Sequence, residues 1–592
     1  MNAFSRRSLI TGATAVGLLA ALPASAHALS APPAVTPDRR SFAPDEQRFA
    51  QYLMLVSPMV ADMNASGFFG GGWWRSPNAP YNARVQEHVY TLAWFATQAR
   101  PWNPYRGDAN VLAALDAGLA HYLGLQHADG SWPEYSADQH SLAATGFGMG
   151  YLSKTNALLK RAGALRSRQA QISAALRRAM TWFLDPSNGT VWQSPLTWAN
   201  QTASGLAGAA LALRHDPDAV LRQWLTEAFR RLATVGQSPA GYFYEESGAD
   251  TNYNFEVMLP ELADAWRQTG DPNLVAMTRR YTDWLGYNLL REPDGSGWFA
   301  NIAPNSRTSS KFYADVRPDP ERTALNAQFV PEVPGLAAFV SGREDLAAVR
   351  AAWAASAAPV PALVKPDTSP RILTHAIYGE RYPSRAERTA AIARLPYRRA
   401  HFTERRSDQG QDFLFVRRPR WYVGGYFGTR RATSLARTGL TFLWHPVAGT
   451  LVQSMNNNDH ACWATVFPGQ VPDSRGPQEA EFLGGEPYRF RYRTPSGSVV
   501  TEVAVGDRIV RSVRAGSAAT EQIPLVVRDS DTVALDLRGL TLTRGRTVIR
   551  FDWARELEPR LRPATTITYP GRRMQILTVP HDGTFTLTVT VR

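Results

Sequence analysis

Three hydrogen-bonding side chains stand at roughly equivalent positions of a repeated sequence pattern. His140 and Asn200 each lie eight residues after a tryptophan, and Tyr253 lies ten residues after a phenylalanine. A purely structural repeat would favour similar residues at such positions, but these three differ in chemistry. A single His, Asn or Tyr at a helix start is usually a cap or a surface group, and Asn200 suits a helix N-cap. Their coincidence in one repeat position instead predicts a shared site.

An imidazole, an amide and a phenol together suit the cleavage of an acidic sugar polymer by β-elimination. In that reaction, hydrogen-bond donors neutralise the uronate carboxylate, which acidifies the adjacent C5 proton. A base then removes the proton and an acid protonates the departing bridging oxygen. We therefore expect Asn200 to neutralise the carboxylate, with Tyr253 and His140 as candidates for the proton transfers. This chemistry requires no metal and no cofactor.

The charge balance of the chain agrees with an anionic partner. The 592 residues include 64 Lys+Arg and 51 Asp+Glu, a formal net charge of +13, and only four of the cations are lysines. Arginine binds carboxylate, sulfate or phosphate through two parallel hydrogen bonds. A GC-rich genome would also favour arginine codons, so the Arg:Lys ratio alone decides nothing. The arginines are scattered, without a basic stretch interleaved with aromatics, which argues against a nucleic-acid partner.

The residue composition excludes several classes of protein. A charged fraction of 19%, with 17 Trp and 25 Phe, is typical of a folded chain and not of a disordered one. Cys462 is the single cysteine, which excludes a disulfide scaffold and a multi-cysteine metal site. A structural metal bound by His445 or His460 with Asp459 is an alternative, although no established metal-ligand spacing supports it.

The elements that must position the three side chains are helical hairpins. Glycines next to an aromatic recur at intervals of 59, 59, 52 and 56 residues, at Gly71, Gly130, Gly189, Gly241 and Gly297. This period accommodates two helices and two loops. Such hairpins cannot bury their apolar faces alone and stack into an (α/α) toroid, here a full or incomplete one. The loops that follow the glycines open on one rim, so we expect their polar residues to converge.

The chain changes character at a proline-rich junction. Residues 42–357 show the 3.6-residue apolar period of helices, and residues 371–592 show the alternation of strands. Residues 358–370 form the junction between them. The predicted fold class is therefore α+β and multidomain, with an N-terminal (α/α) toroid followed by an antiparallel β-sandwich.

The first 28 residues have the pattern of an export signal. Arg6 and Arg7 form a twin-arginine pair, and a short apolar run and small-residue cleavage sites follow them. We predict a twin-arginine signal over residues 1–28, a flexible linker over 29–41, and a periplasmic or extracellular location. No later segment approaches the ~18 uninterrupted apolar residues of a membrane span.

Two short motifs carry a family resemblance. The sequence WANQTASG around Asn200 and, about fifty residues later, GADTNYN around Tyr253 resemble heparinase II/III-type and alginate-lyase-type polysaccharide lyases. The resemblance implies a lyase with an amide at Asn200 and Gln201, a tyrosine at Tyr253 and a histidine from the β domain, best matched by His401. Many relatives have His where Gln201 stands, so the division of proton transfer among Tyr253, His401 and His140 is left open.

An anionic polysaccharide is the partner that this resemblance implies. Trp198, two residues before Asn200, is a candidate platform for a sugar ring, whereas Trp132 also suits a packed hairpin corner. The predicted substrate contacts are Gln201, Trp198, Trp132, Arg84, Asn254 and Arg405.

Two other functions fit the same loops. An inverting glycoside hydrolase would use two carboxylates as acid and base; the candidates are Glu134 or Asp138 with Glu245, Glu246 or Asp250. A non-catalytic polysaccharide-binding protein would use the groove only to hold sugar. The identity of the polymer, endo or exo action and the oligomeric state are not indicated by the sequence.

Overall fold

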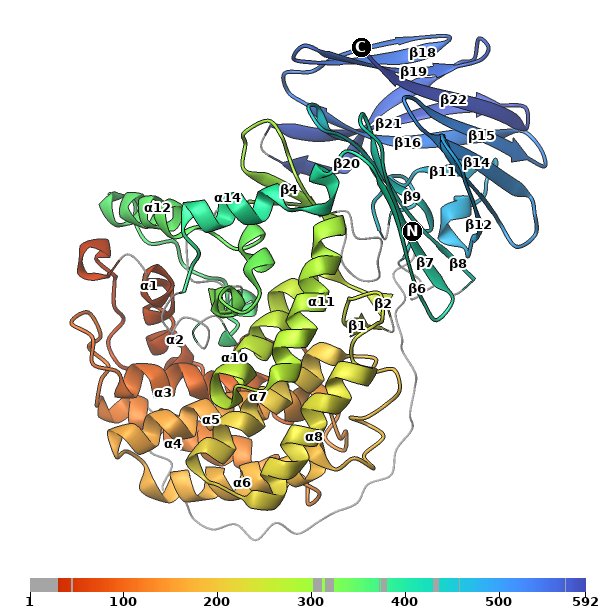
Figure 1. Ribbon diagram of the computed structural model, residues 1–592. Helices are drawn as coiled ribbons and strands as arrows, with labels where there is room; N and C mark the ends of the chain where they lie inside the picture. Colours follow the sequence, from red (N-terminus) through yellow and green to blue (C-terminus); the bar gives the residue numbers. More distant parts are fainter. Residues whose placement is uncertain are drawn as a thin grey trace.

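The computed structural model shows a helical domain and a β domain (Figure 1). The predicted export signal, residues 1–28, lies outside the described part. The structure describes residues 30–43, 46–246, 248–301, 311–314, 324–371, 373, 381–429, 436–456, 458–569 and 571–592.

The helices of the described residues fall almost entirely in the first part of the chain. They are α1 (Gln47–Leu53), α2 (Val56–Ala61), α3 (Val89–Thr97), α4 (Ala109–Gly124), α5 (Leu142–Ala162), α6 (Arg166–Leu184), α7 (Ala199–His215), α8 (Ala219–Val235), α9 (Thr251–Tyr253), α10 (Leu259–Thr269), α11 (Pro272–Asn288), α12 (Arg343–Ala355) and α14 (Arg385–Ala393).

Four antiparallel hairpins, α3–α4, α5–α6, α7–α8 and α10–α11, form the toroid (Figure 1). Their first helices contact one another in the order α3, α5, α7, α10, and their second helices do so in the order α4, α6, α8, α11. The first helices therefore form an inner layer and the second helices an outer one. The repeat predicted from the glycine spacing has this hairpin structure.

Small residues let the inner helices approach closely. A Cβ atom on Gly208 of α7 would lie 2.5 Å from the backbone nitrogen of Gly150 in α5, and one on Gly146 would lie 2.5 Å from the carbonyl oxygen of Gln201. Helix α5 is buried along most of its length, and so is α7. The Gly/Ala-rich sequences of these helices thus bring their N-terminal ends, and the loops before them, close together.

The aromatic residues next to the repeat glycines pack the hairpin corners. Trp132 is fully buried and its indole Nε1–H donates to the carbonyl of Tyr122 at 3.1 Å. Trp192 makes the equivalent bond, also 3.1 Å long, to the carbonyl of Phe183. Gly130 has a φ of +99°, and a Cβ there would lie 2.3 Å from a backbone oxygen of the neighbouring hairpin. The glycine and the tryptophan therefore serve the architecture of the corner.

The β domain contains two large antiparallel sheets. One has the order β20-β21-β16-β10-β9-β8-β7-β6, with β11 also paired to β16, and the other has the order β12-β13-β14-β15-β22-β19-β18-β17. Apolar residues from both sheets form one core, so the domain is a sandwich. Their strands are β6 (Phe402–Asp408), β7 (Gln411–Arg417), β8 (Tyr422–Gly428), β9 (Gly439–His445), β10 (Gly449–Gln453), β11 (Ala464–Val466), β12 (Glu479–Gly484), β13 (Tyr488–Arg493), β14 (Val499–Val505), β15 (Ile509–Ala515), β16 (Ala519–Arg528), β17 (Thr532–Asp536), β18 (Gly539–Arg544), β19 (Thr547–Trp553), β20 (Arg560–Tyr569), β21 (Arg572–His581) and β22 (Thr584–Val591).

The helical part also carries two small sheets, and aromatic packing joins it to the β domain. One small sheet pairs β1 (Tyr244–Glu245) with β2 (Gly248–Ala249). The other has the order β3 (Leu289–Arg291), β4 (Trp298–Asn301), β5 (Lys311–Ala314).

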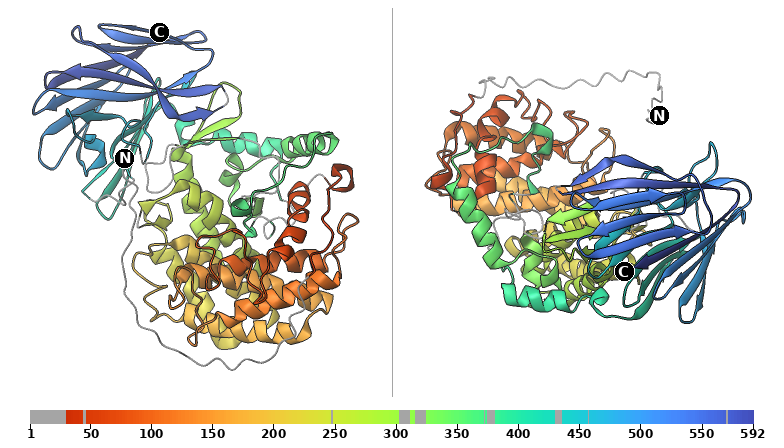
Figure 2. Two further views of the ribbon diagram at one scale, coloured as in Figure 1. Left: turned by 180° about the vertical axis from the view of Figure 1, so that it is seen from behind. Right: turned by 90° about the horizontal axis from the view of Figure 1, so that it is seen from above.

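At the junction between the domains, Trp284 of α11 contacts Phe413 of β7 with ring centroids 4.8 Å apart. The two domains lie next to each other in both views of Figure 2.

The fold class predicted from the sequence is confirmed, and the packing of one helix bears on where the helical domain ends. Helix α14 lies inside the segment predicted as β-sandwich, but Arg388 of this helix donates to the carbonyl of Val340 in the helical part at 2.8 Å. The first strand of the sandwich begins only at Phe402. Because α14 packs on the helical side, we propose the domain boundary near residue 400 instead of residue 371.

Candidate active site

Loops from successive repeats converge on one cleft of about 590 Å³. Trp74 and Arg75 come from the first repeat, His140 from the second, Asn200 from the third and Tyr253 from the fourth. The volume is within the range of ligand-binding pockets. Three side chains singled out by repeat position therefore line one cavity, as does the predicted sugar platform Trp198.

Asn200 is held in the cleft wall by a buried carboxylate. It lies in the first turn of α7, whose N-cap is Trp198, and its side chain makes no cap. Instead, its Nδ2 donates to Glu245 Oε1 at 2.5 Å, and its backbone N–H donates to the same oxygen at 3.3 Å. Glu245 is fully buried, and its backbone forms an antiparallel β-bridge with Trp198. The carboxylate thus satisfies a backbone donor of the helix start and fixes the amide orientation.

Gln201 follows Asn200 on α7 and also lines the cleft. It is partly exposed, whereas only 3% of Asn200 is accessible. Two neighbouring amides of different burial are therefore available as hydrogen-bond donors to an acidic ligand.

Tyr253 is placed by a short helix with its own cap. Asp250 is the N-cap of α9, and its Oδ1 accepts from the backbone N–H of Tyr253 at 3.0 Å. A π-helical turn, Asn254–Met258, follows directly and leads into α10. Such turns are frequent at functional sites because they reorient side chains within a helix. The half-buried Tyr253 lines the cleft in this arrangement.

His140 lines the cleft as an exposed side chain with one anchored nitrogen. Its Nδ1 lies 2.7 Å from Asp129 Oδ2 and 2.7 Å from Ser131 Oγ. Partial burial raises the pKa of Asp129, but hydrogen bonds from Ser131 and His140 outweigh this effect and hold that pKa below its ordinary value. The ionised carboxylate can only accept, so Nδ1 carries the proton and Nε2 is the nitrogen available to a ligand.

Arginines line another part of the cleft. Arg84 and Arg371 both stack on the ring of Phe147, with guanidinium carbons 4.3 Å and 4.4 Å from its centroid. Buried carboxylates pair with both of them: Glu87 with Arg84, and Glu261 with Arg371 at 3.2 Å. The cleft therefore combines neutral donors at α7 with guanidinium groups around Phe147.

Two predicted substrate contacts lie in the core instead of the cleft. Trp132 is fully buried at a hairpin corner, as described above, and cannot stack on a sugar. Asn254 is also fully buried, and its Oδ1 accepts from the backbone N–H of Phe243 at 3.0 Å. The repeat pattern placed them near the site, but it cannot distinguish residues that face the cleft from those that build its wall.

The two predicted contributions from the β domain also lie outside the cleft lining. His401 is exposed, with its Nε2 3.2 Å from Glu486 Oε2. Arg405 of β6 pairs with Asp412 at 3.1 Å and stacks over the ring of Phe482. Both belong to the edge of the sandwich, so the structure does not support a role for either in chemistry at Asn200.

The β domain reaches the rim of the toroid through the β6–β7 hairpin. Asp408 accepts hydrogen bonds from the hydroxyls of Tyr242 at 3.1 Å and Tyr244 at 2.8 Å. Burial raises the pKa of both phenols, so they are neutral donors. Tyr244 directly precedes Glu245 in β1. Through this contact the β domain braces the segment that holds Asn200.

Several residues of the site carried no recognised signal in the sequence. Glu245 was weighed only as a hydrolase acid, yet it is the buried partner of Asn200. Glu134 and Glu245 each stand two residues after the corner aromatic of their repeat, so alignment of the repeats would have shown an acidic position. Among the described carboxylates, Glu134 is the one that lines the cleft. Arg75 and Arg371 are further cleft residues that the sequence did not single out.

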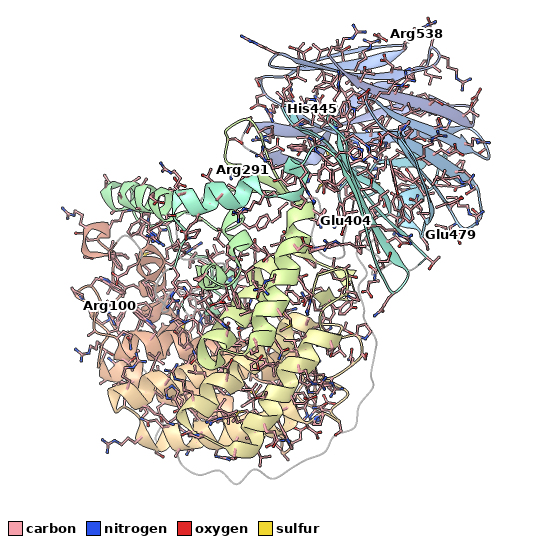
Figure 3. All side chains as sticks on the ribbon, viewed as in Figure 1. Arg100, Arg291, Glu404, His445, Glu479 and Arg538 are labelled. Carbon is pink, nitrogen blue, oxygen red and sulfur yellow. The ribbon has the colours of Figure 1, made fainter. Side chains whose placement is uncertain are left out.

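The residues considered for a metal in the β domain have other partners. Asp459 pairs with Arg437 at 2.8 Å and with Arg475 at 3.2 Å. His445 Nδ1 accepts from the backbone N–H of Ala448 at 3.0 Å; Figure 3 shows this side chain in the β domain. Among the described helices, none is long and apolar enough to cross a membrane.

Comparisons with known proteins identify the fold. A scan against models of protein families finds no match, and neither does a search of curated proteins. Solved structures do match: a heparinase III gene product at 8% identity, with 94% of this chain and 84% of that one covered and a TM-score of 0.52, and another heparinase III at 11% identity, with 88% and 79% covered and a TM-score of 0.50. The fold resemblance predicted from the sequence is confirmed: the chain has the toroid-plus-sandwich architecture of polysaccharide lyases.

Proposed function

We propose that the chain is a polysaccharide lyase that cleaves a uronate-containing anionic polysaccharide by β-elimination in the toroid cleft. The observation that carries this proposal is the convergence of Asn200, Gln201, Tyr253 and His140 on one cavity. The fold of the heparinase III structures supports it independently of these residues.

The carboxylate of the substrate would be neutralised by the two amides of α7. One N–H of Asn200 is occupied by Glu245, and this bond leaves the second N–H as a fixed donor. Gln201 adds a more accessible donor. Preorganised donors of this kind stabilise the charge that develops when the C5 proton leaves.

Proton transfer would use Tyr253, with His140 as its partner. The Tyr253 phenolate would remove the C5 proton, or the phenol would protonate the departing oxygen. One side chain can do both in turn if the proton and the leaving group lie on the same face, because the phenolate becomes the phenol when it takes the C5 proton. His140 offers Nε2 for whichever step Tyr253 does not perform. We leave His401 out of this scheme because it lies at the sandwich edge, paired with Glu486 and outside the lining of the cleft.

A glycoside hydrolase is less well supported by the geometry. Inverting hydrolysis needs two carboxylates on either side of the bond, separated by about 6.5–9.5 Å. In the described part of the cleft Glu134 is the single carboxylate, and Glu245 is turned into the wall against Asn200.

We also propose that the protein acts outside the cytoplasm. The twin-arginine pattern of residues 1–28 supports export, and an anionic polymer outside the cell is a matching partner for a basic protein. Expression in a host with and without a functional twin-arginine system, followed by fractionation, tests this point. The protein should remain in the cytoplasm of the host that lacks the system.

The activity is tested by a screen of uronate polymers followed by near-ultraviolet absorbance. Elimination leaves a double bond between C4 and C5 of the new terminal uronate, which absorbs there, and hydrolysis does not. Alginate, unsulfated and sulfated chondroitin, heparan sulfate and a bacterial exopolysaccharide form a suitable panel. Reducing ends that appear without a rise in absorbance would contradict the lyase, and binding without turnover would favour a binding protein.

A further inference from the structure

Arg84 has hydrogen-bonding capacity that the described protein does not use. Only 1% of its side chain is exposed. Its Nε donates to Glu87, and its Nη1 lies 3.6 Å from Glu134 Oε1, beyond hydrogen-bond length. Its Nη2 is buried and has no hydrogen-bond partner in the described part of the chain. A buried guanidinium donor without a partner is costly, and Arg84 lines the cleft.

Arg75, from the same repeat, is still less engaged. Its guanidinium forms no ion pair with any described residue, and its buried Nε has no hydrogen-bond partner. The side chain lines the cleft and stacks over the indole ring of Trp74, with the guanidinium carbon 4.8 Å from the ring centroid. The charge of Arg84 and burial together lower the pKa of Arg75 to about 10, so it is still charged at neutral pH.

The surrounding contacts fix the two arginines in this arrangement. Glu87 is fully buried, and its two oxygens accept from Arg84 Nε and from Trp74 Nε1, the latter at 2.8 Å. The same carboxylate therefore holds Arg84 and the tryptophan on which Arg75 lies. Glu134, the nearby acid in the cleft, accepts from the hydroxyl of Ser141 at 3.0 Å. The site thus consists of buried, paired groups around two guanidinium groups, each of which has an N–H donor without a described hydrogen-bond partner.

We propose that Arg75 and Arg84 form a second anion-binding subsite, which holds a carboxylate or sulfate on a sugar adjacent to the one that is cleaved. The inference rests on the proposed function, since Asn200 and Gln201 are taken to bind the first carboxylate. Arg75 and Arg84 come from the first repeat and the two amides from the third, and all four residues line the same cleft. Guanidinium groups bind both kinds of anion through paired N–H donors.

The consequence is a preference for polymers with acidic groups on consecutive sugars. A chain that alternates a uronate with an uncharged sugar would fill the amide site and leave Arg75 and Arg84 without an anion. A polyuronate, or a polymer whose amino sugar is sulfated, would satisfy both sites. The arginine subsite would therefore select polymers with acidic groups on consecutive sugars, whereas the amide site would require only a uronate.

The test is binding of three tetrasaccharides to the full chain carrying Tyr253→Phe, which prevents turnover. Unsulfated chondroitin tetrasaccharide has acid on alternate sugars, sulfated chondroitin tetrasaccharide adds sulfate on the amino sugar, and tetramannuronate has a carboxylate on every sugar. Isothermal titration calorimetry should show at least one of the two densely charged probes binding about tenfold more tightly than unsulfated chondroitin. Which of them does so distinguishes sulfate from carboxylate as the anion.

Arg75→Gln is the decisive variant, because Arg75 forms no ion pair whose loss would unbalance the described fold. It should reduce the preference to about twofold or less and leave the affinity for unsulfated chondroitin unchanged. Arg166→Gln, at an exposed position of α6, is the matched control for loss of one positive charge and should keep the preference.

Each other outcome is informative. If wild-type Arg75 and Arg75→Gln show the same preference, or if Arg166→Gln lowers it equally, the subsite is overturned and the lyase proposal stands. Equal affinity for all three probes also overturns it. If no probe binds any variant, the proposed function fails for these polymers and the subsite fails with it.

Discussion

Two buried arginines, one in each domain, show how the same residue serves different ends. Arg544 of the sandwich donates from all three guanidinium nitrogens, to Asp531 and to three backbone carbonyls, at distances of 2.7–3.1 Å. Arg84 of the toroid pairs with Glu87 and keeps one nitrogen without a described partner. A guanidinium whose nitrogens all donate to protein acceptors stabilises the fold. One that keeps an N–H donor without a described partner beside a cavity is available to a ligand. The difference lies in the surroundings, not in residue type or burial.

Two histidines, one in each domain, also differ in their surroundings and not in their pairing. His140 and His401 are both exposed, and both are paired with a carboxylate. His140 stands where the loops of the toroid converge on a cavity, and His401 stands at an open edge of a sheet. The paired carboxylate is therefore no guide to function by itself. We predict that the chemistry is confined to the toroid and that the sandwich contributes only structure.

Removal of the Tyr253 hydroxyl should produce the largest effect. Tyr253→Phe is expected to lower kcat by about a thousandfold, because the phenol is proposed to transfer a proton in the reacting complex and Phe keeps the aromatic ring that lines the cleft. Substrate affinity, measured by calorimetry, should change little. Tyr488→Phe, a β-domain tyrosine, is the control and should retain full activity. Comparable losses in both variants would break the proposed separation of the domains.

Weakening the support of Asn200 should have the next largest effect. Glu245→Gln keeps the volume and one acceptor but removes the charge that holds the amide. We expect kcat to fall about tenfold while KM changes less, since the amide acts mainly on the charge that develops during reaction. The melting temperature of the variant should be measured in parallel. A loss of activity explained entirely by unfolding would contradict a positioning role.

The two domains should respond to pH in opposite directions. Burial lowers the pKa of His88 in the toroid to about 3, so protons bind the unfolded chain first and stability falls as pH drops below 6.5. Burial raises the pKa of Asp473 in the sandwich to about 7, so stability falls as pH rises from 3.8 to 7. The His88 contribution amounts to about 2 kcal/mol between pH 6.5 and 5.

Calorimetric unfolding across this pH range, with variants of each group, measures the two contributions. His88→Gln should flatten the acid limb, and Asp473→Asn should flatten the slope between pH 4 and 7. If neither variant changes the pH dependence of its domain, the two groups do not titrate as their burial implies.

Variants of the sandwich edge should have the smallest effect. His401→Ala and Arg405→Gln remove one exposed pair each, worth at most about 1 kcal/mol of stability. We expect kcat and KM to stay within about twofold of the unaltered protein, because neither side chain lines the cleft. A large loss of kcat in His401→Ala would return this histidine to the mechanism and overturn the contrast between the domains.

The sequence predicted the architecture better than the site. Glycine spacing and apolar periods determine hairpins and strands locally, so toroid and sandwich could be anticipated. Repeat position also brought out Asn200, Tyr253 and His140. It misplaced Trp132 and Asn254, because a repeat position does not reveal on which side of a loop a side chain packs. His401 was chosen because the family resemblance implies a histidine from the β domain. Only the packing of the β domain on the toroid shows where such a histidine lies.

The partners that matter most were the hardest to anticipate. Glu245 is 45 residues from Asn200 in the chain and becomes its partner only when the third and fourth hairpins stack. Arg75 is close enough to Glu87 and Glu134 to feel their charge but forms no ion pair with any described residue. A sequence lists charged residues but does not show which of them remain without a partner after folding.

The mass balance of cleavage decides between elimination and hydrolysis in the toroid cleft. Elimination adds nothing to the substrate, so the masses of the two fragments of a defined uronate oligosaccharide sum to the mass of the intact one. Hydrolysis adds one water. We predict that the fragment masses sum to the substrate mass, that one fragment carries a terminal unsaturated uronate, and that the fragments are absent with Tyr253→Phe. Fragments that sum to the substrate plus one water, or cleavage that persists in Tyr253→Phe, would contradict this prediction.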